Sequence, residues 1–221
     1  MEEVDLLSDI AGEWLSSDER INALAQLTPE QAADYRALCW QRVREATGAE
    51  LKGKTLLDKL SLHTLSLPLI AKLFPQAKVL FALRDPRDVV LSCFRRRFQI
   101  NPAMFELLDL QGAARFYHEV MTLAQTSRAL LPIDVREVRH EQVVENFEQT
   151  IRSLLDFIGL EWQSALTQFS NNLPADPRTP SDVQLWRGLN ADGLAQWRRY
   201  NMQMMPVMDT LVPRVRRFGY Y

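Results

Sequence analysis

The sequence predicts an α/β protein with a single domain at residues 1–221, in which a parallel central sheet is flanked by helices. Short apolar runs at 55–57 and 78–83 and an alternating run at 134–139 are typical of strands. Segments with helical periodicity separate these runs, which favours right-handed β-α-β units. Within the run 78–83, the residues Val-Leu-Phe-Ala-Leu at 79–83 are all apolar, as expected of a strand that is buried on both sides.

Composition sets limits on the class of protein. With 221 residues, 47% of them hydrophobic and 24% charged, the chain can form one sizeable core. The formal net charge of -2 disfavours nucleic-acid or membrane binding by the whole surface, so anion binding needs a local group of cations. Cys39 and Cys93 lie in apolar helical patterns and are expected to be buried free thiols. The acidic N-terminus and the lack of a long apolar run predict a cytoplasmic protein without a membrane span.

Helices are expected in several segments between and after the strands. Residues 5–47 carry apolar side chains at helical spacing, and the run Thr28-Pro29-Glu30-Gln31 predicts a capping box at the start of a helix. Further helices are expected at 65–74, 111–131, 146–159 and 194–215. Residues 170–192 are rich in Asn, Pro, Asp and Gly, and we expect a long surface loop there.

The run Arg84-Asp85-Pro86-Arg87-Asp88 lies between the predicted strand 78–83 and a helical pattern. Asp85 is expected to cap that helix, Pro86 to be its first residue and Asp88 to complete a capping box. Such a turn brings a helix N-terminus to the carboxyl end of a parallel strand, where open α/β sheets bind phosphate groups.

Two side chains of this segment are candidates for binding one phosphate group. Arg84 would bind it through its guanidinium, and Ser92, two helical turns into the helix, through its hydroxyl. A capped crossover helix with solvated arginines would show the same pattern, so both interpretations stay open at this point. Residues 95–97 are three further arginines, which we expect on a solvated or acid-paired face.

These residues resemble the 3'-phosphate-binding segment of sulfotransferases that use 3'-phosphoadenosine 5'-phosphosulfate (PAPS), in which a strand ends in Arg-Asp-Pro and a serine follows that arginine by eight residues. Arg84 and Ser92 have this spacing. The flanking pattern is similar to bacterial sulfotransferases that follow tetratricopeptide repeats and to tyrosylprotein sulfotransferases. The resemblance covers nearly the whole chain. It implies a P-loop-like sulfotransferase fold, PAPS as cofactor, adenosine 3',5'-bisphosphate as product and no metal.

Other segments support the resemblance in the expected order. Asp58-Lys59 precedes an apolar helix, although Ser61 stands where the family usually has proline. The run 138–144 resembles the family's Tyr-Glu-x-Leu-Val segment, with His140 at the tyrosine position. Residues 178–187 are similar to the loop that closes over the nucleotide, and 196–200 to the helix after it.

The resemblance implies a role for seven side chains. Glu3 matches the base that takes the acceptor proton, and Lys59 the lysine that stabilises the bridging oxygen. The implied cofactor-binding residues are Arg84, Ser92, His140, Ser181 and Arg187. Plainer alternatives stay open: Glu3 and Lys59 as solvated residues, and His140 as a structural hydrogen-bonding residue instead of an adenine contact.

The resemblance also implies a function and an incomplete fold. The family's Pro-Arg-Ser-Gly-Thr-Thr-like loop, which holds the 5'-phosphosulfate, has no counterpart in the sequence. We therefore expect a chain that begins too late, lacks the first strand and transfers little sulfate alone. The expected reaction is sulfuryl transfer from PAPS to a hydroxyl of a tyrosine, a carbohydrate or a small molecule, with tetratricopeptide repeats upstream in the full-length protein. The alternatives are a non-catalytic nucleotide-binding or partner-docking module and, last, RNA binding.

Overall fold

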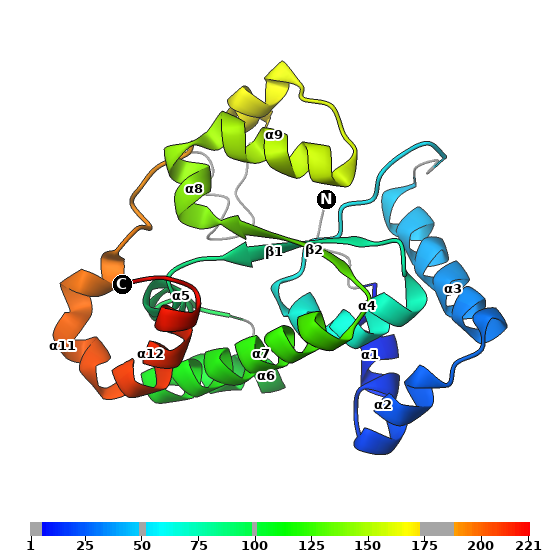
Figure 1. Ribbon diagram of the computed structural model, residues 1–221, viewed down its shortest axis with the longest axis horizontal. Coiled ribbons are helices and arrows are strands. Elements are labelled where there is room, and N and C mark those ends of the chain that lie inside the picture. The colour runs from blue at the N-terminus through cyan, green and yellow to red at the C-terminus, as the bar shows by residue number, and fades with distance from the viewer. Residues whose placement is uncertain (1–5, 49–51, 99–100, 173–187) are drawn as a thin grey trace. The chain divides into compact units, whose positions relative to one another are not determined.

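The computed structural model describes residues 6–48, 52–98, 101–172 and 188–221 (Figure 1). The chain divides into two compact units, one formed by residues Met1–Ala77 and Val120–Asp134 and the other by Lys78–Glu119 and Val135–Tyr221. We call them unit 1 and unit 2, and the helix α7, Leu110–Leu130, contributes to both. The expectation of a single domain at 1–221 stays a prediction.

Unit 1 is helical in the part that the structure describes. Its elements are α1 Ser8–Trp14, α2 Asp18–Ala25, α3 Pro29–Thr47, the 3-10 helix η1 Ser61–Ser66 and α4 Leu67–Leu73. The predicted capping box is confirmed at the start of α3: the Gln31 amide donates to the Thr28 hydroxyl, and the Thr28 amide donates to the Gln31 side chain. Leu69 and Leu73 are fully buried in a core that packs α4 against the first three helices.

The predicted strand at 55–57 is wrong. Residues 54–60 form neither helix nor strand in the structure, and the side chain of Leu57 is 74% exposed. An apolar run forms a strand only where a partner strand satisfies its backbone and a core covers its face. Within the described residues the run 55–57 has no partner strand, and the predicted strand does not form.

Unit 2 contains the sheet. The strands β1, Lys78–Leu83, and β2, Asp134–Arg139, have the bounds that the sequence predicts, and they pair as neighbours that run in the same direction (Figure 1). The expectation of a parallel sheet flanked by helices is thus confirmed only as a small two-stranded sheet in a mostly helical protein. Leu83 at the end of β1 is 2% exposed, so the turn that follows β1 begins next to a buried residue.

Helices around this sheet position the turn after β1. They are α5 Pro86–Phe94, α6 Pro102–Phe105, η2 Glu106–Leu108, α8 His140–Glu145, α9 Phe147–Ile158 and η3 Ser164–Asn172. The helix α9 ends at Gly159, whose φ of 77° lies in the left-handed region that glycine adopts at low cost. The sequence predicts a helix at 146–159 and thus the end of this helix at Gly159.

The C-terminal segment of unit 2 is broken where the sequence predicts one helix at 194–215. It contains η4 Gln196–Tyr200, α11 Asn201–Met204, η5 Met205–Val207 and α12 Met208–Arg217. Pro206 has no amide hydrogen to donate within a continuous helix, which explains the break at η5. The helix α12 packs against α5 around Val90, Leu91 and Leu211 (Figure 1).

Both cysteines are free thiols, Cys39 buried and Cys93 half-buried. Within the described ranges, no helix is both long enough and apolar enough to span a membrane.

Candidate functional site

The turn between β1 and α5 is built around Asp85. Its carboxylate accepts a hydrogen bond of 2.9 Å from the Arg87 amide, which caps α5, and Pro86 is the first helical residue, as the sequence predicts. The same carboxylate binds the Arg87 guanidinium through two bonds, 2.9 Å from Nε and 2.7 Å from Nη2. Both side chains are buried, so this turn is held by a bidentate ion pair shielded from solvent.

Asp88 has a different partner from the one expected. The sequence predicts that it completes a capping box with the Asp85 amide, but its Oδ1 accepts a bond of 2.8 Å from the Trp197 amide at the start of η4. Burial raises the pKa of Asp88, and the hydrogen bond from Trp197 opposes this. The Asp85 amide is instead satisfied by Glu141, at 3.0 Å, because the end of β2 lies beside the end of β1.

Arg84 and His140 converge on Gly193. The Nη2 of Arg84 donates to the Gly193 carbonyl oxygen. A Cβ atom at Gly193 would lie 3.3 Å from this Nη2 and 3.7 Å from the Nε2 of His140, so the close approach favours glycine. Within the described residues, the Nε of Arg84 is buried and has no hydrogen-bond partner. An oxyanion or a water would satisfy this donor.

The surroundings of His140 disfavour its charged form. It is half-buried at the start of α8, immediately after β2. Burial and the positive charge of Arg84 lower the pKa of His140, while the carboxylates of Glu141 and Asp88 act in the opposite sense. A neutral imidazole can both donate and accept a hydrogen bond, which suits contact with a nucleobase as well as a structural role.

The lowered pKa of His140 predicts a loss of stability in acid. As the pH falls through about 6.5, the histidine of the unfolded chain takes up a proton, whereas the folded one does so only at lower pH, so the free energy of unfolding decreases. We expect a smaller decrease between pH 7 and pH 5 for His140→Gln than for the wild type, measured by urea unfolding. His63→Gln controls for the loss of a histidine elsewhere. An equal decrease in wild type and His140→Gln would contradict the assignment.

Glu141 links the turn to the C-terminal residues. Its Oε1 accepts from the Asp85 amide at 3.0 Å, and its Oε2 accepts from the Tyr220 hydroxyl at 2.8 Å. Burial and this hydrogen bond raise the pKa of Tyr220, so the phenol stays protonated as a donor. The guanidinium of Arg139 lies 5.0 Å from the centre of the Tyr220 ring. Glu141 therefore holds the backbone next to Arg84 from the start of α8, just after β2.

The arginines after α5 are largely solvated, as the sequence predicts: Arg95 and Arg97 are exposed and Arg96 is half-buried. Arg95 donates to the Gln196 side chain at 3.1 Å and lies 5.1 Å from the centre of the Tyr200 ring. Arg96 donates to the Ser92 hydroxyl at 3.5 Å. The described residues contain no hydrogen bond between Ser92 and Arg84, so their shared binding of one phosphate stays a prediction.

The remaining predicted residues belong to unit 1 or lie outside the described residues. Lys59 is exposed in unit 1, in the segment 54–60 without regular structure. Glu3, Ser181 and Arg187 lie outside the described residues. In the part of the chain that the structure describes, no group of three or more His, Cys, Asp or Glu side chains is suited to a metal ion.

Sequence reasoning assigned no site role to three residues of the cluster. Glu141 follows His140 directly at the predicted strand end, so the sequence could have suggested a hydrogen-bonding role for it. Gly193 and Tyr220 carried no local signal, because each contacts a partner far away in the sequence.

Comparison with known proteins identifies the family. The family model described as the sulfotransferase family matches residues 5–164, which is more than half of the chain. The chain belongs to the sulfotransferase family. The matched range contains the turn after β1 and the end of β2, whereas Gly193, Trp197 and Tyr220 of this sulfotransferase-family chain lie beyond it.

Several curated proteins are similar to this sulfotransferase-family chain. Protein-tyrosine sulfotransferase A of Caenorhabditis elegans is 22% identical over 218 residues, which cover 96% of this chain and 57% of that protein. Protein-tyrosine sulfotransferase 1 of Danio rerio is 25% identical over 162 residues, covering 70% and 45%. An uncharacterized protein of Aquifex aeolicus is 27% identical over 158 residues, covering 71% and 20%. The chain thus matches only part of each relative, from 20% to 57% of its length.

Proposed function

We propose that this chain binds the 3'-phosphate of PAPS at the turn between β1 and α5 and belongs to an enzyme that transfers a sulfuryl group to a hydroxyl. The buried Nε of Arg84 is the observation that carries the proposal, since no other described residue accepts its hydrogen bond. The donor lies at the carboxyl end of a parallel strand and at a helix N-terminus, the usual place for a phosphate group in α/β proteins. Membership in the sulfotransferase family supports PAPS as the ligand.

Five residues of this chain are proposed to bind the nucleotide. Arg84 and the Ser92 hydroxyl bind the 3'-phosphate, and neutral His140 contacts the adenine. Ser181 and Arg187 are proposed to add contacts from the segment 178–187. PAPS, when bound, supplies the activated sulfuryl group.

The two proposed catalytic side chains act on opposite sides of the transferred group. Lys59 places a positive charge beside the leaving-group oxygen, and Glu3 accepts the proton of the acceptor hydroxyl. The names of the similar proteins make tyrosine the first acceptor to test.

Replacing Arg84 with glutamine is expected to weaken binding of adenosine 3',5'-bisphosphate about tenfold or more, because charge-assisted hydrogen bonds to phosphate are lost. Isothermal titration calorimetry measures the dissociation constant. Adenosine 5'-monophosphate, which has no 3'-phosphate, should bind wild type and variant with similar affinity. Arg97→Gln is the matched control, since Arg97 is an exposed arginine just after α5.

Two results would count against the proposal: wild type that does not bind the bisphosphate, or an Arg84→Gln variant that binds it as well as wild type. Binding without transfer of label from PAPS to a tyrosine peptide by the full-length protein would favour the non-catalytic nucleotide-binding module.

A further inference from the structure

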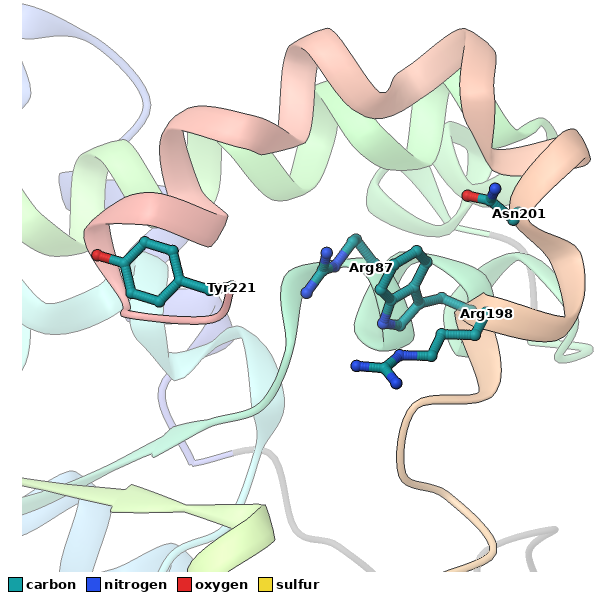
Figure 2. Close-up of a pocket in the computed structure, with 5 residues that line it drawn as sticks. Arg87, Arg198, Asn201 and Tyr221 are labelled. Carbon is teal, nitrogen blue, oxygen red and sulfur yellow. The ribbon is translucent and has the colours of Figure 1, made fainter.

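A pocket of about 330 Å³ lies in unit 2 beside the start of α5 (Figure 2). It is lined by Arg87, Trp197, Arg198, Asn201 and Tyr221. We propose that this pocket binds a small molecule through an oxyanion group, that is, a sulfate or phosphate group. None of the lining residues is among those that the proposed function assigns to the nucleotide, so this site stands independently of that function.

Arg87 is a buried donor that faces the pocket. Its side chain is 8% exposed, and its position is fixed by Asp85 on one side and by the Trp197 ring, 3.9 Å from the guanidinium carbon. A guanidinium has five N–H donors. The bonds to Asp85 engage Nε and Nη2, and among the described residues no acceptor is found for Nη1. The pocket therefore contains an oriented donor that lacks a protein acceptor within the described part of the chain.

Arg198 provides the positive charge that Arg87 does not. The carboxylate of Asp85 neutralises Arg87, whereas Arg198 is exposed, with its guanidinium 5.8 Å from the centre of the Trp197 ring. Figure 2 shows the side chains of Arg87 and Arg198 near the Trp197 ring, and both residues line the pocket. Two planar guanidinium groups around one space suit the several acceptor oxygens of a sulfate or phosphate group.

The size of the pocket indicates a ligand larger than a bare ion. A volume of about 330 Å³ lies at the lower end of the range for small-molecule sites. The lining residues include the aromatic ring of Trp197, whose centre lies 3.9 Å from the guanidinium carbon of Arg87 and 5.8 Å from that of Arg198. The ligand class is therefore an organic molecule with one oxyanion group, of which an aryl sulfate is a simple representative.

Titration with inorganic sulfate tests the oxyanion site. The chain has five tryptophans, and the indole N–H signal of Trp197 in a two-dimensional nitrogen–proton NMR spectrum is assigned by its loss in Trp197→Phe. At constant ionic strength, we expect sulfate to shift this signal saturably. Arg198→Gln should raise the dissociation constant about fivefold or more, because a charge-assisted hydrogen bond is lost. Phenyl sulfate should shift the same signal at lower concentration.

Arg199→Gln is the matched control. Arg199 is the next residue, is also exposed and does not line the pocket, so its replacement should leave the sulfate affinity unchanged. A shift that does not saturate, or equal losses of affinity in Arg198→Gln and Arg199→Gln, would overturn the proposal. Loss of the sulfate response in Arg84→Gln, or its displacement by adenosine 3',5'-bisphosphate, would also overturn it, because the sulfate would then occupy the nucleotide site.

Discussion

Replacing Asp85 with alanine is expected to lower the free energy of unfolding by about 3–5 kcal/mol, the usual cost of removing one partner of a buried ion pair. The variant leaves the Arg87 guanidinium buried without its counter-charge and removes the cap of α5. Urea unfolding followed by circular dichroism measures the change.

Two variants show whether burial of the pair causes the effect. Glu148 and Arg152 form an exposed ion pair of 2.7 Å in the same unit, and Glu148→Ala should cost only about 0–1 kcal/mol. The double variant Asp85→Ala/Arg87→Met should be more stable than Asp85→Ala alone, because it leaves no uncompensated charge. A double variant that is no more stable than the single one would show that the buried charge is not the main cost.

Replacing Glu141 with alanine is expected to weaken binding of adenosine 3',5'-bisphosphate about tenfold, since hydrogen bonds to a charged group are worth about 1.5–3 kcal/mol. Glu141 holds the amide next to Arg84, so its loss frees the turn that orients the guanidinium. Because this is a positioning effect, the preference for the bisphosphate over adenosine 5'-monophosphate should fall. A general loss of stability would instead weaken the binding of both ligands to the same extent. Calorimetry with both ligands, at a temperature where the variant is folded, separates the two cases.

The contribution of Tyr220 is tested by removing one oxygen. Tyr220→Phe keeps the ring beside Arg139 but removes the donor to Glu141, and we expect a smaller loss of the same preference. Tyr221→Phe is the matched control because this neighbouring side chain is 93% exposed. Equal preferences in wild type, Tyr220→Phe and Glu141→Ala would refute a positioning role for Glu141.

The sequence predicts the elements whose signals are local. The strands at 78–83 and 134–139, the caps at Thr28 and Asp85 and the helix end at Gly159 each depend on a few neighbouring residues, and all are present in the structure.

The sequence does not predict contacts between distant segments. Asp88 is bound by the Trp197 amide and Arg84 by the Gly193 carbonyl, both across 109 positions of the chain. Short-range patterns carry no information about such partners, and for the same reason the apolar run 55–57 predicted a strand for which no partner strand is found within the described residues. The residue types of the candidate site were therefore predictable in part, but the groups that hold them in place were not.

The separation of 109 residues between Arg84 and Gly193 also has a consequence for the order of folding. Closing a loop of that length costs more conformational entropy than forming the short-range contacts of α1 with α2 or of α8 with α9. We infer that the segment around Gly193 docks on α5 late in refolding. Ligand binding during refolding would then report the last step of folding, after the helical signal has already recovered.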